Sequence, residues 1–290
     1  RMSLKARLKQ PEILVAPGVY DGLTATLAAS AGFEALYLSG AAVAYTRLGR
    51  PDIGLTSLSE MADTMALIRD RVDLPVIIDA DTGFGNALNA QRTMRIYERA
   101  GANALQIEDQ SYPKRCGHLA DKSLISKEEM VGKISAMAEA RASDETLIIA
   151  RTDAIGVEGI EAAMVRAEAY VAAGADVLFV EAPRSAEELA RVAGTFAGRV
   201  PLLANMVEGG ATPVQKAEDL QALGFDIVIF PGGIVRALAK SAAAYYGSLK
   251  AHGSNAPFSE HMFDFNGLND VLGTSDMLAA GRRFEGLGEG

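Results

Sequence analysis

The most chemically distinctive stretch of this sequence is the pentapeptide Lys-Arg-Cys-Gly-His at residues 114–118. It contains the only cysteine of the chain, Cys116, and one of its three histidines, His118. Positive charge beside a thiol lowers the thiol pKa, so Arg115 and His118 make Cys116 a candidate acid or base. The alternative is a buried cysteine that acts as a small hydrophobic side chain beside solvated charges. The neighbouring residues have to decide between these two interpretations.

Four acidic residues form a second candidate group, each at the end of an apolar run or in the loop after one: Asp52, Asp79, Asp81 and Glu108. Asp79 and Asp81 are two positions apart, so on a strand both side chains would point to the same side. A site made only of oxygen ligands suits Mg²⁺ or Mn²⁺. The alternative is a set of helix caps and surface acids. We predict a divalent metal site.

Three polar residues that follow further apolar runs are suited to an anionic substrate: Arg151, Glu181 and Asn205. An arginine can hold a carboxylate through two parallel hydrogen bonds. The alternative is a structural ion pair and a capping amide at the rim of the sheet. The sequence therefore predicts a small-molecule carboxylate as the ligand.

Two glycine-containing segments could bring backbone N–H groups close to a ligand. Ser39, Gly40 and Ala41 could bind a second carboxylate, since glycine permits a close approach. Residues 83–85, Gly-Phe-Gly, give only a weak dinucleotide signal, because the third glycine of that motif is absent.

These side chains need a scaffold that gathers distant parts of the sequence. Eight short apolar runs alternate with stretches that suit helices: residues 13–19, 35–40, 75–81, 104–109, 146–152, 177–182, 201–206 and 226–232. Strands that are apolar on both faces are typical of a covered parallel sheet. A glycine that ends a helix just before a strand recurs at residues 31–38, 100–107, 173–180 and 223–230.

Eight β–α units in about 250 residues predict a closed (β/α)₈ TIM barrel of the α/β class, with an open Rossmann-like sheet as the alternative. The carboxyl ends of barrel strands converge on one face, and the candidate residues fall there. Residues 110–125 form a longer connection than the usual two to six residues, and they carry the pentapeptide. We expect this segment to be a lid.

The domain organisation follows from the same pattern. We predict a single barrel domain over residues 1–290, with a C-terminal helical extension over about residues 252–290. This extension contains apolar residues, such as Phe263, Phe265 and Leu272, that must pack either on their own barrel or on a neighbouring subunit.

Composition narrows the possible partners and surroundings. The net charge of −9 argues against binding to nucleic acid or to an anionic membrane. One cysteine excludes an intramolecular disulfide framework and a cysteine-based zinc cluster. The sequence has no apolar run of about 18 residues and no secretory pattern at its start. We therefore expect a cytoplasmic protein.

Four motifs together carry a family resemblance: residues 79–85 (DADTGFG), 107–110 (IEDQ), 114–118 (KRCGH) and 205–210 (NMVEGG). From about residue 17 to residue 250 the chain resembles the isocitrate lyase and phosphoenolpyruvate mutase superfamily, and the pentapeptide is specific to its carbon–carbon lyase branch. The resemblance implies a barrel whose last helix is swapped between subunits of a homotetramer, a dimer of dimers.

The resemblance also implies a mechanism. Mg²⁺ near Asp79, Asp81 and Glu108, with Asp52 in an outer position, would bind the 2-hydroxy-carboxylate end of a substrate such as 2-methylisocitrate or 2,3-dimethylmalate. Loss of the hydroxyl proton then drives carbon–carbon cleavage to pyruvate or another 2-oxo acid. The other fragment leaves as an enolate, which Cys116 would protonate.

In the same scheme, Cys116 is kept able to donate its proton by Arg115, His118 and Glu181. Tyr37 is the candidate for the base that takes the hydroxyl proton.

Two departures from the family pattern bear on the substrate. Methylisocitrate lyases usually have a hydroxyl two residues after the asparagine, where this chain has Val207, which favours a smaller dicarboxylic 2-alkylmalate. Oxaloacetate hydrolases usually have serine where this chain has Pro231, which disfavours that activity without removing it.

Three alternatives to the lyase remain open. One is an oxaloacetate hydrolase or decarboxylase. Another is phosphonopyruvate or carboxyphosphonate chemistry of the phosphoenolpyruvate mutase type, although such relatives generally lack the pentapeptide cysteine. The last is a binding protein that retains the barrel without turnover.

Overall fold

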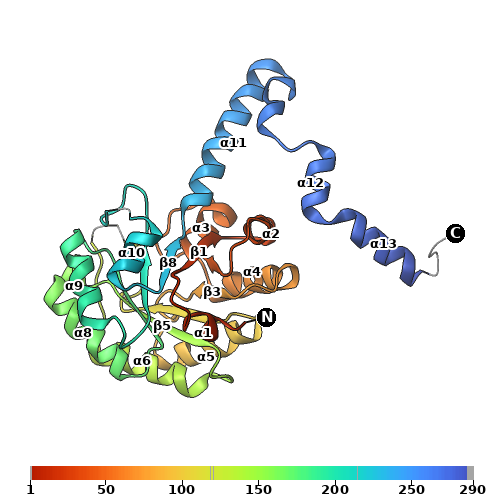
Figure 1. The fold of residues 1–290 in the computed structure, drawn as a ribbon. Coiled ribbons are helices and arrows are strands. Elements are labelled where there is room, and N and C mark those ends of the chain that lie inside the picture. Colours follow the sequence, from red (N-terminus) through yellow and green to blue (C-terminus); the bar gives the residue numbers. More distant parts are fainter. Residues whose placement is uncertain (1, 118, 120, 214, 286–290) are drawn as a thin grey trace. The chain divides into compact units, whose positions relative to one another are not determined.

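A computed structural model describes the whole chain except residues 1, 118, 120, 214 and 286–290. Its centre is a closed barrel of parallel strands in which each strand pairs with its sequence neighbours and β1 pairs with β8 (Figure 1). The strands are β1 (Leu14–Val19), β2 (Leu36–Leu38), β3 (Val76–Asp79), β4 (Ala104–Glu108), β5 (Leu147–Thr152), β6 (Val177–Val180), β7 (Leu202–Asn205) and β8 (Ile227–Phe230). The predicted (β/α)₈ barrel is confirmed, and the open sheet is excluded.

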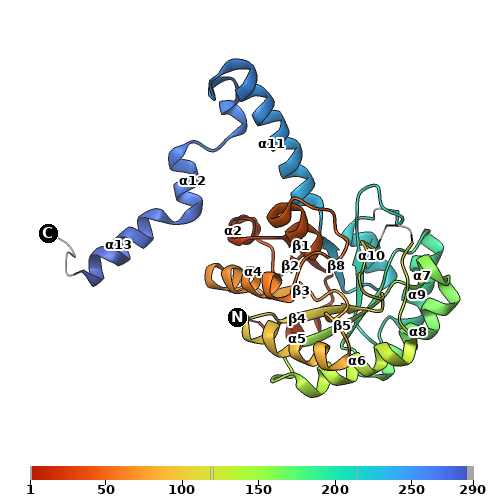
Figure 2. The same ribbon diagram turned by 180° about the vertical axis from the view of Figure 1, so that it is seen from behind.

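Helices surround this barrel, as the view from behind shows (Figure 2). The longer ones are α2 (Gly22–Ser30), α4 (Leu58–Arg71), α5 (Ala87–Arg99), α6 (Lys127–Ala140), α8 (Ile160–Ala172), α9 (Ala186–Phe196) and α10 (Ala217–Leu223). A further helix, α11 (Gly233–His252), follows β8 in the chain. Short ones lie at the start of the chain and after β2 and β5: α1 (Leu4–Arg7), α3 (Gly40–Val43), the π-helix η1 (Ala44–Leu48) and α7 (Ala154–Val157).

Local sequence fixes where several of these helices begin. Ser57 accepts a hydrogen bond from the Glu60 N–H at 3.3 Å, and the Glu60 carboxylate accepts one from the Ser57 N–H at 2.8 Å. This reciprocal arrangement satisfies two N–H groups that the first turn of α4 leaves unpaired. Ser126 caps α6 in a similar way, accepting from the Glu129 N–H at 3.1 Å.

The core has an inner and an outer part because each strand buries both faces. Inside the barrel lie strand residues such as Ile77, Ile149 and Phe179, and Leu4 of α1 joins this cluster. Between strands and helices lie two further clusters, which include Met65 and the strand residues Val76 and Val228. The apolar runs are therefore continuous rather than alternating, as burial on both faces requires.

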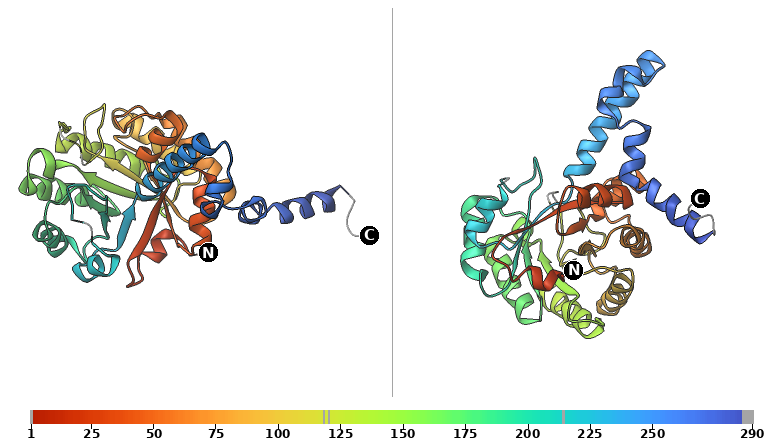
Figure 3. Two further views of the ribbon diagram at one scale, coloured as in Figure 1. Left: turned by 90° about the horizontal axis from the view of Figure 1, so that it is seen from above. Right: turned by 45° about the vertical axis from the view of Figure 1, so that its right-hand side comes forward.

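A second compact unit, Arg236–Gly290, begins within α11, and its helices are drawn in blue (Figure 3). It continues through the 3₁₀ helix η2 (Ala256–His261), α12 (Phe265–Leu272) and α13 (Thr274–Phe284). Tyr245 packs edge-on against Phe258 with ring centroids 5.6 Å apart. Phe265 is 83% exposed and Met277 is 69% exposed, so this unit carries large apolar side chains that its own helices do not bury.

Among the described residues, no helix combines the length and the apolar character that crossing a bilayer requires.

Closure of the barrel between β1 and β8 depends on Gly18. A Cβ atom at this position would lie 2.1 Å from the carbonyl oxygen of Pro231. We expect Gly18→Ala to lower the free energy of unfolding by about 3 kcal/mol, because backbone atoms have to move apart to admit the methyl group. Urea unfolding measures this change.

The matched control is Gly132→Ala in α6, where an added Cβ meets no heavy atom within 4 Å. This variant should be about 0.5–1 kcal/mol more stable than the wild-type chain, since alanine is a better helix former. A Gly18→Ala protein as stable as Gly132→Ala would show that the β1–β8 contact is not tight.

Candidate active site

The carboxyl ends of β4, β5, β6 and β7 bring the predicted anion-binding residues together. Arg151 Nη1 lies 3.2 Å from Glu108 Oε2, and Arg151 Nη2 lies 3.4 Å from Glu181 Oε2. Asn205 Nδ2 donates to the same Glu181 oxygen at 3.1 Å. These four residues therefore form one connected polar group in the mouth of the barrel.

Asp153 completes this group, although sequence reasoning did not select it as a site residue. Its carboxylate accepts hydrogen bonds from Arg151 Nε at 2.9 Å and Nη2 at 3.0 Å. Burial raises the pKa of Asp153, but the charges of Arg151 and Lys122 outweigh it and hold the pKa below its ordinary value. The two hydrogen bonds to Asp153 thus fix the orientation of the Arg151 guanidinium group.

The acidic residues of the predicted metal site surround Lys114, which the sequence analysis also did not select. Lys114 Nζ lies 2.7 Å from Asp52 Oδ1 and 2.8 Å from Asp81 Oδ1. The lysine side chain is only 4% exposed. Burial alone lowers the pKa of Lys114, but Asp81 and Asp52 raise it well above its ordinary value, so the lysine stays charged.

The spacing of Asp79 and Asp81 predicted that both lie on one strand. The structure differs, because β3 ends at Asp79 and Asp81 lies beyond it. It follows the end of β3 with a left-handed φ of +46°, and its N–H donates to Asp79 Oδ1 at 3.1 Å. Aspartate tolerates this conformation because its short side chain bonds locally. The turn still keeps both carboxylates buried at the same strand end, each 6% exposed.

Burial shifts the pKa values of two of these acids, Asp81 and Glu108. Desolvation raises the pKa of Asp81 to about 7, although Lys114 pulls it down. Desolvation also raises the pKa of Glu108 well above its ordinary value, while Arg151 opposes the shift. Both oxygens of Glu108 are buried without a hydrogen bond. A positive charge placed next to such buried carboxylates strongly stabilises their ionised form.

These observations decide whether the site suits a divalent cation. In the described ranges, no three His, Cys, Asp or Glu side chains are grouped as metal ligands. Lys114 contacts both Asp52 and Asp81. The donors are nevertheless all carboxylate oxygens, and Glu108 lacks hydrogen-bond donors. The residues therefore fit a cation that prefers oxygen ligands, on condition that Lys114 yields its position.

The segment 39–41 lies beside these acids, and its N–H groups are partly used. Ser39 N–H donates to the Val19 carbonyl at 3.2 Å, and Gly40 N–H lies 3.3 Å from Asp79 Oδ2. A Cβ on Gly40 would lie 2.9 Å from the same oxygen, so glycine is needed for the approach. The Ser39 hydroxyl caps α3 by accepting from Ala42 N–H. The N–H groups of Ser39 and Gly40 therefore already have partners within the protein.

Tyr37 is placed as a hydrogen-bond donor. Its hydroxyl donates to Gln106 Oε1 at 2.6 Å, inside the barrel. Burial and the charge of Asp79 raise the pKa of Tyr37 well above its ordinary value. A phenol in this state holds its proton near neutral pH, which does not favour the predicted role of initial base.

The pentapeptide loop packs directly on this polar group. Cys116 N–H donates to the Asp52 carbonyl at 3.2 Å. Gly117 lies so close that a Cβ there would be 2.4 Å from Arg151 Nη2 and 2.8 Å from Glu181 Oε2. Gln110 holds the preceding residue from both sides, donating to the Arg115 carbonyl at 2.8 Å and accepting from its N–H at 2.9 Å. The loop backbone therefore lies close to Arg151 and Glu181, two of the residues predicted to bind an anionic substrate.

Arg115, one of the two charged neighbours predicted to act on Cys116, lies partly at the surface. The Arg115 side chain is 46% exposed and lies 3.5 Å from Asp121 at the surface. His118 lies outside the described residues. Cys116 itself is half-buried.

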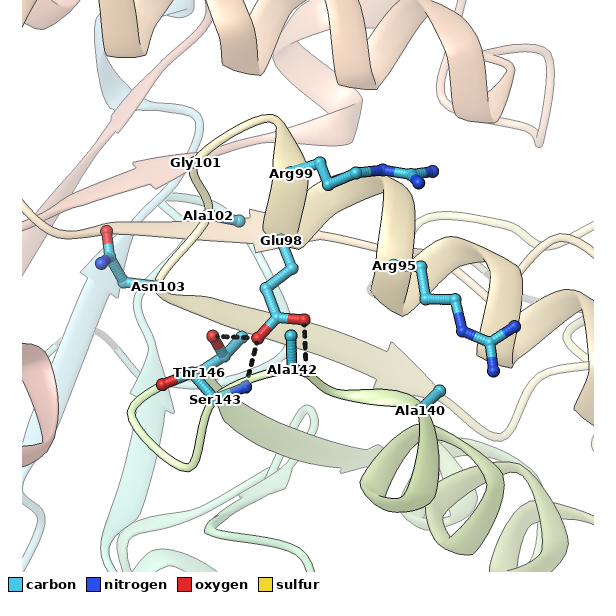
Figure 4. A pocket seen from close by; sticks show the side chains of 10 residues that line it. All are labelled: Arg95, Glu98, Arg99, Gly101, Ala102, Asn103, Ala140, Ala142, Ser143 and Thr146. Carbon is cyan, nitrogen blue, oxygen red and sulfur yellow. Dashed lines mark hydrogen bonds between the residues drawn. The ribbon is translucent and has the colours of Figure 1, made fainter.

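A separate cavity of about 620 Å³ lies away from this mouth, near the starts of β4 and β5 (Figure 4). The ends of α5 and α6 line it, together with Asn103 and Thr146. Glu98 points across it and accepts hydrogen bonds from Ala142 N–H at 2.8 Å and Ser143 N–H at 3.0 Å. None of the predicted site residues contributes to this cavity.

The fold and the mouth together define a (β/α)₈ barrel enzyme with buried carboxylates and cations at the ends of its strands. A family model described as phosphoenolpyruvate phosphomutase matches residues 4–249. The chain belongs to this family, which is part of the isocitrate lyase and phosphoenolpyruvate mutase superfamily.

Two curated relatives match nearly the whole chain. The 2,3-dimethylmalate lyase of Eubacterium barkeri is 42% identical over 270 residues, covering 93% of each protein. The 2-methylisocitrate lyase of Aeropyrum pernix is 48% identical over 275 residues, covering 94% of this chain and 87% of the relative.

Solved structures agree with these matches. A structure of 2,3-dimethylmalate lyase has a TM-score of 0.90 at 39% identity and covers 96% of this chain and 93% of its own. One of oxaloacetate acetylhydrolase has a TM-score of 0.92 at 34% identity, with coverage of 99% and 97%. One of phosphonopyruvate hydrolase with oxalate and Mg²⁺ has a TM-score of 0.87 at 30% identity, with coverage of 97% for both.

Lys114 gives a direct test of the charge balance in the mouth. Lys114→Met leaves Asp52 and Asp81 buried without their cation, so the free energy of unfolding in EDTA should fall by about 3–5 kcal/mol. Added Mg²⁺ should recover part of this loss and should stabilise the variant more than the wild type. Urea unfolding with and without Mg²⁺ measures both effects.

Lys127→Met is the control, since that lysine is 39% exposed at the start of α6. Its stability should change by less than about 0.5 kcal/mol. If Lys114→Met were as stable as this control, the buried ion pairs would not contribute as described.

Proposed function

We propose that this protein cleaves a carbon–carbon bond of a 2-hydroxydicarboxylate or 2-hydroxytricarboxylate, releasing pyruvate or another 2-oxo acid. The observation that carries the proposal is the close approach of Gly117, the residue after Cys116, to Arg151 and Glu181. This contact joins a potential proton donor to a fixed carboxylate-binding cation. The named carbon–carbon lyases among the relatives support the same reaction class.

The acidic residues of the mouth provide the cation site of this reaction. Asp79, Asp81 and Glu108 would hold Mg²⁺ or Mn²⁺, with Asp52 behind them, and Lys114 would move aside. A bound divalent cation would stabilise negative charge on the 2-hydroxyl oxygen of the substrate. The likeness to a structure that contains oxalate and Mg²⁺ supports this choice of metal.

The remaining residues of the mouth bind the substrate and direct the proton. Arg151 binds the carboxylate of the 2-oxo acid half, and Asp153 fixes the plane of its guanidinium group. Asn205 and Glu181 orient each other beside it. The Cys116 thiol gives its proton to the enolate carbon of the departing fragment and becomes a thiolate. Tyr37 serves as a hydrogen-bond donor rather than as the base.

Val207 bears on the choice of substrate. It lies two residues beyond Asn205, where methylisocitrate lyases usually have a hydroxyl that holds an additional carboxylate. Leaving a buried carboxylate without that donor is unfavourable. We therefore favour a dicarboxylic 2-alkylmalate such as 2,3-dimethylmalate over 2-methylisocitrate.

Hydrolysis of oxaloacetate is a second candidate function. The likeness to oxaloacetate acetylhydrolase supports it, because that structure covers almost the whole chain. Pro231 opposes it, since its carbonyl packs against Gly18 and its side chain offers no hydroxyl.

The assembly that we propose is a homotetramer of helix-swapped dimers. The exposed apolar residues of the second unit support it, including Phe263, Phe265 and Met277. Large apolar side chains that stay exposed on a single chain are typical of subunit interfaces.

The reaction is tested by coupling 2-oxo acid release to lactate dehydrogenase with Mg²⁺ present, using 2,3-dimethylmalate and 2-methylisocitrate side by side. We expect pyruvate or its analogue from at least one of them, with faster release from 2,3-dimethylmalate. Cys116→Ala should reduce turnover by about 100-fold or more, because the enolate loses its proton donor.

Binding of oxalate with Mg²⁺ to Cys116→Ala, measured by calorimetry, serves as the control and should match the wild type. No product from either acid, together with oxalate and acetate from oxaloacetate, would replace the lyase with the hydrolase. Full turnover by Cys116→Ala would remove the thiol from the mechanism.

A further inference from the structure

Lys122 lies in the segment that follows the pentapeptide, and its charged end is buried. The side chain is only 4% exposed. Its ammonium group donates one hydrogen bond to the Gly117 carbonyl and one to Asp153 Oδ1, the second at 3.0 Å. A buried ammonium group is unfavourable unless it is paired, so these two contacts determine where Lys122 can lie.

The first partner, Gly117, is the residue whose backbone rests on Arg151 and Glu181. A hydrogen bond to its carbonyl holds the backbone on the far side of Gly117, one residue beyond Cys116. Since the N–H of Cys116 is held by the Asp52 carbonyl, the cysteine backbone is anchored on both sides. The orientation of the thiol then depends on Lys122 as well as on Asp52.

The second partner, Asp153, is the residue that orients Arg151. Asp153 Oδ1 accepts from both Lys122 Nζ and Arg151 Nη2, each at 3.0 Å. The Asp153 N–H in turn donates to Asp109 Oδ1 at 2.8 Å, and Asp109 is buried. A single carboxylate, supported from the barrel wall, therefore sets the positions of the loop lysine and of the carboxylate-binding arginine together.

The missing side chain of Gly156 leaves room for the end of the Lys122 side chain. A Cβ on Gly156, in α7, would lie 3.2 Å from Lys122 Nζ and 3.3 Å from its Cε. The glycine allows the amine to lie against α7 while it reaches both partners.

We propose that Lys122 is a positioning residue that fixes Cys116 relative to the substrate carboxylate held by Arg151. The inference rests on the proposed lyase activity, in which the thiol must meet an enolate that forms next to Arg151. Lys122 acts through Gly117 and Asp153 and does not itself touch the reacting atoms.

The test compares Lys122→Met with Lys127→Met, an exposed lysine a few residues further along. Turnover of the substrate should fall by about 100-fold in Lys122→Met, because a displacement of the thiol of about 1 Å has an effect of this size. KM should change much less, since Arg151 keeps both of its bonds to Asp153. Lys127→Met should match the wild type in both constants.

A second readout does not depend on the reaction. The rate at which iodoacetamide alkylates Cys116, followed by mass spectrometry, should rise about 10-fold in Lys122→Met, the effect of losing one charge-assisted hydrogen bond on an equilibrium. Gly156→Ala retains the lysine but crowds it, and should raise the alkylation rate in the same direction. This variant also serves if Lys122→Met does not fold.

The outcomes separate this proposal from the proposed function. If Cys116 is alkylated faster in Lys122→Met than in the wild type, and the wild type releases no 2-oxo acid, the positioning role is supported and the lyase is rejected. An active lyase in which Lys122→Met alters neither turnover nor alkylation would overturn the positioning role and leave the lyase in place. An equal loss of turnover in Lys127→Met would also overturn it.

Discussion

The structure of the mouth depends on keeping buried negative charge balanced. Asp81, Glu108 and Asp153 are almost completely removed from solvent at the ends of neighbouring strands. A buried carboxylate is stable only if it is protonated or if a cation lies next to it. Lys114 and Arg151 supply that positive charge, and both are buried themselves. The acids and the cations therefore hold each other in place.

The barrel makes this balance possible because it gathers strand ends that are far apart in the sequence. Parallel pairing places Glu108 of β4 directly opposite Arg151 of β5. Glycines then allow the loop backbone to approach this group, and at Gly117 any larger residue would collide with Arg151. The loop that carries Cys116 is consequently connected to the same charges through Lys114 and Lys122.

The sequence predicts the barrel well because burial on both strand faces leaves continuous apolar runs, and because polar residues then mark the strand ends. It predicts strand ends less well. The run at residues 35–40 yields only Leu36–Leu38, since Ser39 caps a helix that starts at once. Asp81 likewise leaves the strand in a left-handed turn. Apolar periodicity carries no information about such local hydrogen bonds.

The site was predicted in part for the same reason. Arg151, Glu181 and Asn205 could be found because each follows an apolar run. Lys114 and Lys122 could not be assigned partners, because the path of residues 110–125 follows no periodic pattern and depends on acids elsewhere in the chain. Asp153 could have been selected from the sequence, because it is adjacent to a predicted strand end.

The central claim is that burial raises the pKa values of Asp81 and Glu108 and that a divalent cation can replace their protons. Titration calorimetry of Mg²⁺ binding near pH 6, in buffers with different ionisation enthalpies, measures the protons released. Because the pKa of Asp81 lies at about 7, the account predicts release of about one proton per Mg²⁺, with affinity rising as the pH increases through 7. Mg²⁺ binding without proton release, and with an affinity that does not change over this range, would contradict the account.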